Sequence, residues 1–197
     1  METQEIISKL ETFDGTFPKE ALEAAIKKRE GITPVLLDSL DNVIRNAERF
    51  SKYGDYILHT HSLYLLAQFR EIQAYPLIYK FFSLPFSTLE RLIGDAHIEQ
   101  AGRMLASVCD DDLSLIKELI ENPDIDEYPR TFIFDALIVL MVNGVLSREE
   151  VIEYLIELFD GKLEQKKAFI WNGLISTCLD LNAFELMDRI KIAFSNN

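Results

Sequence analysis

The chain has 197 residues, enough for one domain, and a net charge of −13. Apolar residues make up 48% of it, too many for a disordered protein. Binding to a nucleic-acid backbone would need a basic stripe, because neutralised phosphates supply most of the non-specific affinity, and the sequence has no such stripe. An anionic membrane surface is disfavoured for the same reason. The composition predicts a globular protein that binds neither nucleic acid nor a membrane.

Cysteine use and the N-terminus favour a cytoplasmic protein. Cys109 and Cys178 form no CxxC motif, so we expect two free, buried thiols in a reducing compartment. The first residues are acidic and lack the basic start of a signal peptide. The longest apolar run, 132–142, is interrupted by Asp135 and is too short to span a bilayer. It is typical of a buried helix.

Helical periodicity dominates the first third of the chain. Residues 18–29 form an amphipathic pattern. Thr33 followed by Pro34 indicates the start of a second helix, because threonine caps and proline suits the first helical position. We expect this helix to run to about Phe50, and a third to cover about 55–70.

Capping boxes and glycines predict the ends of the later helices. Another helix is expected over about 96–109. The capping boxes are Ser87–Glu90, Ser147–Glu150 and, more weakly, Asn182–Glu185. The glycines expected to end helices are Gly94, Gly144 and Gly161.

One pattern recurs: two apolar residues, two polar or amphipathic ones, then two apolar ones. Its copies are Leu77–Phe82, Leu115–Ile120, Val151–Ile156, Leu186–Lys191 and a degenerate Leu36–Asp41. Each of the four full copies follows a longer apolar helix and a short polar connection. Because one helical hairpin cannot bury its apolar stripe alone, neighbouring hairpins would stack and share a core.

The repeats predict an all-α fold, a HEAT-like α-α superhelix of about five antiparallel helical hairpins. An irregular helical bundle is the alternative. We expect a single domain over 1–197. Its repeats would lie at about 18–51, 55–83, 88–121, 129–160 and 165–195.

Three segments support this fold by resemblance. They are Gly54–Arg70, Gly94–Ala96 together with Arg103–Val108, and Val145–Glu150. Together they resemble an uncharacterised bacterial family of HEAT-like proteins that carries a domain-of-unknown-function label. Some members of that family carry a short Cys-rich metal-binding tail after this domain, whereas this sequence ends at Ser195-Asn-Asn197. The resemblance implies a helical-repeat fold and no particular chemistry.

The histidines give no metal site. His59 and His61 are two residues apart, so on a helix they project about 200° from each other and cannot hold one ion together. We expect one to be buried and hydrogen-bonded and the other to lie at a groove. His97 stands near Asp95 and Glu99, again without ligand spacing. The sequence predicts no catalytic, cofactor or metal site, although it leaves open a dyad of a cysteine with a histidine.

Residues 110–127 hold eight acidic side chains against one lysine. We interpret this stretch as helix N-capping by Asp111 or Asp112 plus solvated charge; a docking patch for a basic partner is the alternative. A calcium loop is disfavoured, because the EF-hand spacing and its glycine are missing.

Two residues in the C-terminal half are singled out by their surroundings. Asp135 lies inside an apolar run, so it would face a polar edge or meet a cation such as Arg103 or Arg130. Trp171 is interpreted as a core residue, with an interface anchor as the alternative.

The hypothesis for function is a non-catalytic scaffold that binds a protein or peptide on the concave face of the superhelix. The middle positions of each hexad would line this face. The residues are Tyr79, Lys80, Lys117, Glu118, Glu153, Tyr154, Asp188 and Arg189, beside Asp38 and Ser39 of the degenerate copy. Two alternatives stay open: these are merely solvated helix faces, or the protein is an enzyme whose pocket forms across repeats.

Overall fold

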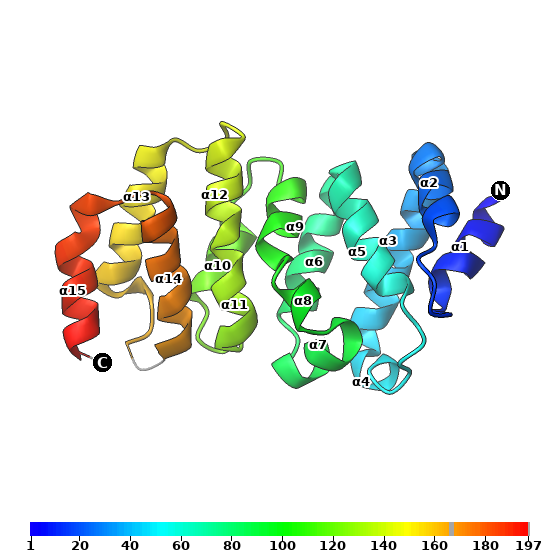
Figure 1. Cartoon of the computed structure of the whole chain (residues 1–197), viewed down its shortest axis with the longest axis horizontal. Coiled ribbons are helices and arrows are strands. Elements are labelled where there is room, and N and C mark those ends of the chain that lie inside the picture. The colour runs from blue at the N-terminus through cyan, green and yellow to red at the C-terminus, as the bar shows by residue number, and fades with distance from the viewer. Residues whose placement is uncertain (166–167, 197) are drawn as a thin grey trace. The chain divides into compact units, whose positions relative to one another are not determined.

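The computed structural model describes residues 1–165 and 168–196 of the chain (Figure 1). Regular structure in these residues is helical, and an isolated antiparallel bridge joins Thr12 to Tyr56. The all-α prediction is therefore confirmed. The chain forms two compact units, residues 1–98 (unit 1) and 99–197 (unit 2). The superhelix and the repeat boundaries stay predictions.

Unit 1 is built around its longest helix, α3, which packs against α5 and α6. Apolar side chains at helical spacing make its core, and Leu36, Leu63 and Phe81 are fully buried there. The helices are α1 (Thr3–Glu11), α2 (Lys19–Lys27), α3 (Arg29–Arg45), α4 (Ala47–Phe50), α5 (Leu58–Phe69), α6 (Tyr75–Phe82), α7 (Phe86–Ile93) and α8 (Asp95–Ile98).

Backbone hydrogen bonds join the exit of α1 to the entry of α5. The Phe13 amide donates to the Asp55 carbonyl at 2.8 Å, and the Ile57 amide donates to the Glu11 carbonyl at 2.9 Å. The segment that follows α1 is therefore held at its start against a part of unit 1 that is distant in sequence.

The expected helix start at Thr33-Pro34 is wrong. Helix α3 already begins at Arg29 and includes both residues. The Thr33 hydroxyl donates to the Arg29 carbonyl at 2.8 Å, so it bonds back into the helix and does not cap it. Pro34 is exposed, so water can reach the helix backbone where the proline donates no hydrogen bond.

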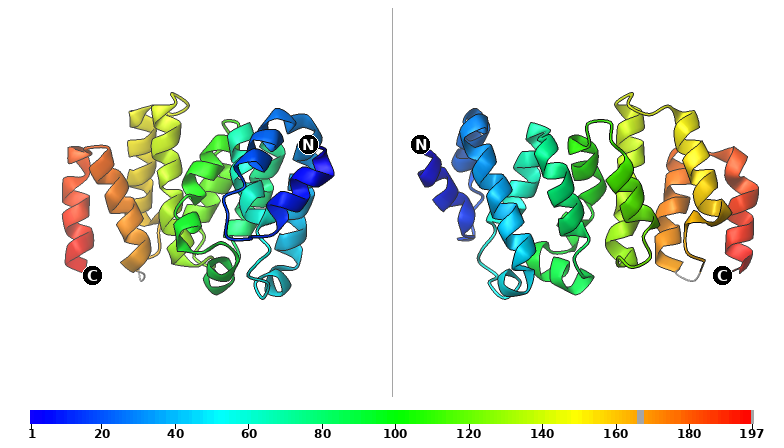
Figure 2. Two further views of the ribbon diagram at one scale, coloured as in Figure 1. Left: turned by 45° about the vertical axis from the view of Figure 1, so that its right-hand side comes forward. Right: turned by 180° about the vertical axis from the view of Figure 1, so that it is seen from behind.

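Unit 2 places α11 and α12 between α9 and α14 (Figure 2). Its helices are α9 (Ala101–Val108), α10 (Ser114–Glu121), α11 (Glu127–Ile133), α12 (Asp135–Val142), α13 (Arg148–Glu157), α14 (Ala168–Asp180) and α15 (Met187–Asn196). The core is again apolar, with Ile116, Leu119, Leu155 and Leu174 fully buried.

Two glycines allow close helix packing in unit 2. A Cβ atom on Gly102 of α9 would lie 2.4 Å from the Phe132 carbonyl oxygen, and one on Gly173 of α14 would lie 2.6 Å from the Thr131 carbonyl oxygen. Both glycines therefore contact the backbone of α11, one from each side. Any larger residue would push these helices apart.

The capping box at Ser147 is confirmed. The Glu150 amide donates to Ser147 Oγ at 3.1 Å, and the Ser147 amide donates to Glu150 Oε2 at 2.8 Å. Gly94 and Gly144 end their helices as expected, with φ of 70° and 74°. Gly161 takes a φ of 126° within a π-helical turn, Leu158–Lys162, that continues directly from the end of α13 at Glu157.

The other two predicted capping boxes are wrong. Helix α7 begins at Phe86 after Pro85, so Ser87 already lies within its first turn. Asn182 has a φ of 49°, in the left-handed region, and gives no side-chain cap to the short helix at Phe184–Leu186. The helix expected over 96–109 is also divided, because α8 ends at Ile98 and α9 begins at Ala101.

Candidate functional site

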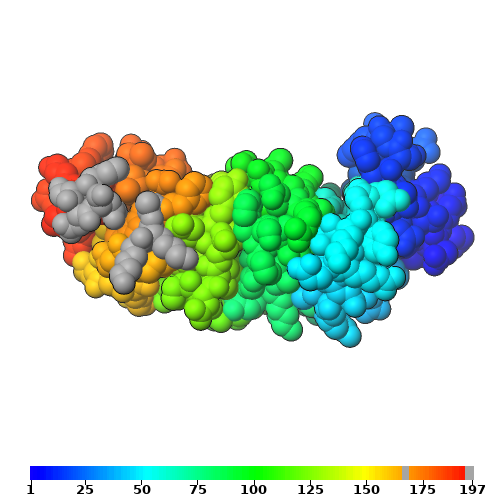
Figure 3. Space-filling view, turned by 90° about the horizontal axis from the view of Figure 1, so that it is seen from below, coloured from blue at the N-terminus to red at the C-terminus, as the bar shows by residue number. Residues whose placement is uncertain are grey.

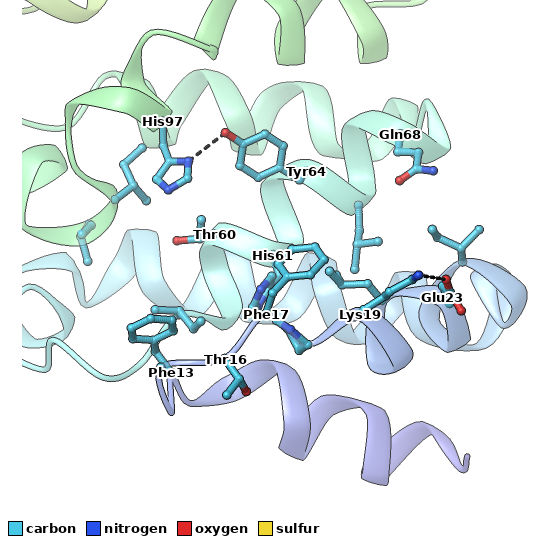
Figure 4. A pocket seen from close by; sticks show the side chains of 18 residues that line it. Phe13, Thr16, Phe17, Lys19, Glu23, Thr60, His61, Tyr64, Gln68 and His97 are labelled. Atoms are coloured by element: carbon cyan, nitrogen blue, oxygen red, sulfur yellow. Dashed lines mark hydrogen bonds and ion pairs between the residues drawn. The ribbon is translucent and has the colours of Figure 1, made fainter.

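Unit 1 contains a cavity of about 760 Å³, here called the N-terminal cavity. It is lined by the segment 13–18 and by residues of α2, α5, α7 and α8 (Figure 4). Pockets of about 300–1,000 Å³ lined by apolar and aromatic side chains are typical of ligand-binding sites.

Large apolar side chains are unusually exposed at this cavity. Phe13 and Phe17 expose 57% and 77% of their surface, and Ile26 and Tyr64 expose 41% and 40%. Single exposed apolar residues are common, but several gathered around one hollow mark an interaction site.

Local hydrogen bonds shape the segment that carries the two phenylalanines. Asp14 Oδ1 accepts from the Thr16 amide at 2.9 Å and from the Thr16 hydroxyl at 2.6 Å. Gly15 between them has a φ of 88°, a conformation that side chains disfavour. Figure 3 shows the blue N-terminal residues standing as a ridge beside the cyan residues that lead into α5.

Three of the polar side chains in the cavity are titratable rings: His61, Tyr64 and His97. His61 Nδ1–H donates to the Leu10 carbonyl at 2.8 Å, which leaves Nε2 as an acceptor. The Tyr64 hydroxyl and His97 Nδ1 are 2.8 Å apart (Figure 4). Burial lowers the pKa of both histidines and raises the pKa of Tyr64. At neutral pH all three are therefore uncharged hydrogen-bonding groups.

His59 projects from the other face of α5. Its Nε2–H donates to the Leu92 carbonyl at 2.8 Å, and burial lowers its pKa to about 4. In the described part of the chain its Nδ1 has no hydrogen-bond partner. The expectation that one of His59 and His61 is buried and the other lies at a groove is confirmed.

Within residues 1–165 and 168–196, no group of three His, Cys, Asp or Glu side chains is placed to hold a metal ion. His97 is bonded to Tyr64 and not to the acidic residues beside it in the sequence. Among the same residues, no helix is both long and apolar enough to cross a bilayer.

The residues expected to bind a partner divide between the units. Tyr79 and Lys80 belong to α6 of unit 1; Tyr79 is half-buried and Lys80 is exposed. The remaining residues belong to unit 2. Glu118, Glu153 and Asp188 are exposed there, whereas Lys117 and Arg189 are half-buried. Arg189 pairs with Asp160 at 3.1 Å.

Tyr154 is not an accessible anchor, contrary to the expectation for the hexad. It is 4% exposed, because this position of α13 faces α10. Lys117 Nζ of α10 lies 4.5 Å from the centre of its ring and Lys162 Nζ lies 5.8 Å from it. Burial raises the pKa of Tyr154. Removing this ring would therefore lower stability, so a substitution of Tyr154 would not separate an effect on partner binding from an effect on folding.

Of the two cations expected near Asp135, Arg103 is the one whose charge acts on its pKa. Burial raises the pKa of Asp135, while the charge of Arg103 lowers it. Arg130, the other expected partner, instead pairs with Glu164. Trp171 is 5% exposed and donates its Nε1–H to the Glu164 carbonyl at 3.0 Å, so its assignment to the core is confirmed.

The cysteines are confirmed as free and buried. Burial raises the pKa of Cys109, and raises that of Cys178 to about 11. Neither is an activated thiolate at neutral pH. In the acidic stretch, Asp112 Oδ1 accepts from the Ser114 amide at 2.9 Å at the start of α10.

Sequence reasoning missed the N-terminal cavity. The available signal was Phe13 and Phe17 in a short polar loop with Asp14 and Gly15, where no helical stripe could bury them. Helical periodicity finds core faces, and a pair of aromatic residues outside any helix has no periodicity to detect.

The whole chain, residues 1–197, matches a family described as "Protein of unknown function (DUF1186)". It is 40% identical over 195 residues to an uncharacterised protein of Chlamydia trachomatis, covering 99% of this chain and 77% of that protein. An uncharacterised protein of Chlamydia muridarum is also 40% identical over 195 residues, with 99% and 78% covered. No solved structure matches the chain. The match over the full length and the identity to both relatives show that the chain belongs to the DUF1186 family.

Proposed function

We propose that this protein is a non-catalytic interaction module that binds a helical segment of a partner protein in the N-terminal cavity. The observation that carries the proposal is the gathering of exposed large apolar side chains around this cavity, Phe17 and Phe13 above all. Aromatic residues supply much of the binding energy at protein interfaces, and they do so around solvent-excluding pockets.

The shape of the cavity favours a helix as its occupant. Helices α2 and α5 contribute two of its walls, with Ile26 and Leu22 on one and Tyr64 and Leu65 on the other. An amphipathic helix places apolar side chains at spacings of three and four residues along one face and can lay that face into such a groove.

The polar groups of the cavity favour binding over catalysis. The raised pKa of Tyr64 keeps the phenol protonated, and the lowered pKa values of His61 and His97 keep both rings neutral. The imidazole of His61 is oriented by the Leu10 carbonyl, and no nucleophile is bonded to it in the described residues. These groups suit fixed hydrogen bonds to a partner.

Charge favours a partner segment with a basic polar face. The chain carries a net charge of −13, and long-range attraction of a basic segment would raise the rate of association. The nearest fixed charges at the cavity, Lys19 and Glu23, neutralise each other at 3.9 Å. Affinity would therefore come from apolar contact, and charge would act mainly on the rate of encounter.

A synthetic helical peptide tests this proposal. The probe has leucines on one face and lysines on the other, with a fluorescent label, and its binding is followed by anisotropy. We expect saturable binding and an association rate that falls with added salt. The double variant Phe17→Ser, Ile26→Ser should bind at least tenfold more weakly, because it removes two exposed apolar side chains from the cavity rim.

The matched control is Phe184→Ser in unit 2, which removes an equally exposed phenylalanine, 75% accessible, outside the cavity. It should bind the peptide as the unchanged protein does. Equal binding by the double variant would refute the proposal, and so would the absence of any binding by the unchanged protein.

A further inference from the structure

A second cavity lies wholly within unit 2 and has a different chemistry. It measures about 460 Å³ and is bounded by the start of α9, the junction of α11 and α12, and one face of α14. We call it the polar cavity. The lining side chains that could contact a ligand are Gln100, Arg103, Phe132, Asp135, Phe169 and Asn172.

Three charged side chains line this cavity, Glu99, Arg103 and Asp135, and Arg103 is the one cation among them. The charge of Arg103 reaches Asp135 and lowers its pKa, yet the two side chains make no ion pair or hydrogen bond with each other. In the described part of the chain neither side chain has another hydrogen-bonded partner. Unlike charges that share one cavity and remain apart leave room for a ligand that carries both complementary groups.

Two amide side chains of the cavity are also available for a ligand. Gln100 and Asn172 each offer an amide donor and an amide acceptor, and no hydrogen bond uses either side chain within residues 1–165 and 168–196. The hydroxyls of Thr131 and Thr177, by contrast, already donate to the Glu127 and Gly173 carbonyls at 2.8 and 2.9 Å. The two hydroxyls thus serve the helix backbone, whereas the amides of Gln100 and Asn172 could bind a ligand.

The walls of the cavity are fixed by backbone contacts. Gly102 and Gly173 bring α9 and α14 directly against the carbonyl oxygens of α11. Glu127 Oε2 accepts from the Phe169 amide at 3.1 Å and holds the start of α14 in place. Phe169 stacks on Tyr128 with ring centres 5.2 Å apart. Phe132 and Phe169 thus give the cavity an ordered apolar side beside its charges.

We propose that the polar cavity binds an α-carboxylate with an apolar side chain, as carried by a free amino acid or by the last residue of a peptide. The carboxylate would meet Arg103, whose planar guanidinium suits two parallel hydrogen bonds. The α-nitrogen would donate to Asp135, Asn172 would bond the adjoining polar atoms, and the apolar side chain would lie against Phe132 and Phe169. Neither the N-terminal cavity nor its helical partner is needed for this site.

Calorimetric titration of the full chain with three ligands tests the assignment and separates the two sources. The ligands are L-phenylalanine, an N-acetylated hexapeptide that ends in phenylalanine with a free carboxylate, and the same hexapeptide as its C-terminal amide. We expect saturable binding with a stoichiometry of one by L-phenylalanine or by the free-acid peptide. Binding of L-phenylalanine would identify a free amino acid as the source of the α-carboxylate, and binding of the free-acid peptide would identify the end of a peptide chain. The amide should bind at least tenfold more weakly than the free acid.

Variants link the binding to the cavity. Arg103→Gln should weaken binding of the preferred ligand at least tenfold, and because Arg103 is exposed the melting temperature should stay nearly unchanged. Asn172→Ala is a second exposed variant and should weaken binding as well. Arg189→Gln makes the same change of charge on α15, outside the cavity, and should bind as the unchanged protein does. The proposal is overturned if neither free-carboxylate ligand binds at millimolar concentration, if the amide binds equally well, or if Arg103→Gln binds with unaltered affinity.

Discussion

Arg130 and Glu164 form an ion pair in which both terminal nitrogens of the guanidinium donate to the carboxylate, Nη1 to Oε1 and Nη2 to Oε2, the latter at 2.8 Å. Arg130 is fully buried. Its Nε donates to the Leu119 carbonyl at 3.1 Å and its Nη2 to the Ile120 carbonyl at 2.6 Å. One side chain thus satisfies the last carbonyls of α10 and joins α11 to the residues that precede α14.

Arg130→Met should lower the free energy of unfolding by about 3–5 kcal/mol, because it removes the buried guanidinium that binds the Glu164 carboxylate and two carbonyls of α10. Urea unfolding followed by far-UV circular dichroism measures the change. Arg148→Met is the matched control: its pair with Glu185 at 2.7 Å and its longer bonds to the Leu181 and Asn182 carbonyls are partly open to solvent, so the loss should be clearly smaller than for Arg130→Met. Equal losses in the two variants would show that burial of Arg130 does not govern the effect.

Leu155→Ala should destabilise the protein by about 2–5 kcal/mol, the cost of lost burial plus a cavity. Leu155 is fully buried in α13, whereas its neighbour Glu153 is exposed. Denaturant melts of Leu155→Ala and Glu153→Ala compare the two positions, and the second should change stability by less than about 0.5 kcal/mol. A loss below that limit for Leu155→Ala would contradict the packing described here.

Gly102→Ala should lower the free energy of unfolding by about 1–3 kcal/mol, because the added Cβ atom would meet backbone atoms that cannot move aside as a side chain can. Those atoms are the Phe132 carbonyl oxygen, 2.4 Å from the added Cβ atom, and the backbone nitrogen of Ala136, 2.8 Å from it. Gly54→Ala, which meets nothing within 4 Å, should change stability by less than about 0.5 kcal/mol. Thermal melts of both variants give the comparison, and a Gly102→Ala protein as stable as the control would exclude the close approach.

Stability should fall as the solution is acidified from pH 7 to pH 5. The pKa of His59 is about 4 in the folded chain against 6.5 in a free histidine, so between these values the unfolded chain binds a proton that the folded chain does not. The expected loss from this residue is about 2 kcal/mol at pH 5. His61 and His97, whose pKa values are also lowered, act in the same direction.

Urea titrations at several pH values, on the unchanged protein and on His59→Gln, isolate this contribution. The variant should show a shallower dependence between pH 7 and pH 5, because glutamine does not titrate. An identical pH dependence in the two proteins would mean that His59 is protonated at the same pH in both states.

Local signals predicted part of this structure, and their limits are physical. The Ser147 capping box and the ends at Gly94 and Gly144 were predictable, because a few adjacent residues decide them. Thr33-Pro34 was misleading, since a threonine and a proline fit a helix start and also the interior of α3, where Thr33 bonds back to Arg29 and Pro34 is exposed.

The long-range features were not predictable from periodicity. The pairing of Arg130 with Glu164, in place of Asp135, depends on which helices pack together. The burial of Tyr154 depends on the position of α10 relative to α13, which the hexad does not encode. The opposed faces of His59 and His61 were predictable, because helix geometry alone requires them.

The hydrogen bonds between the exit of α1 and the entry of α5, with the Asp14 bonds to Thr16, order the backbone of the segment that carries Phe13 and Phe17. A segment whose backbone is already ordered loses less conformational entropy when the proposed helical partner covers it, so more of the contact energy is retained as affinity. Association at this cavity should then follow a single kinetic phase, without a slow loop rearrangement after the encounter, and substitutions of either phenylalanine should act mainly on the dissociation rate.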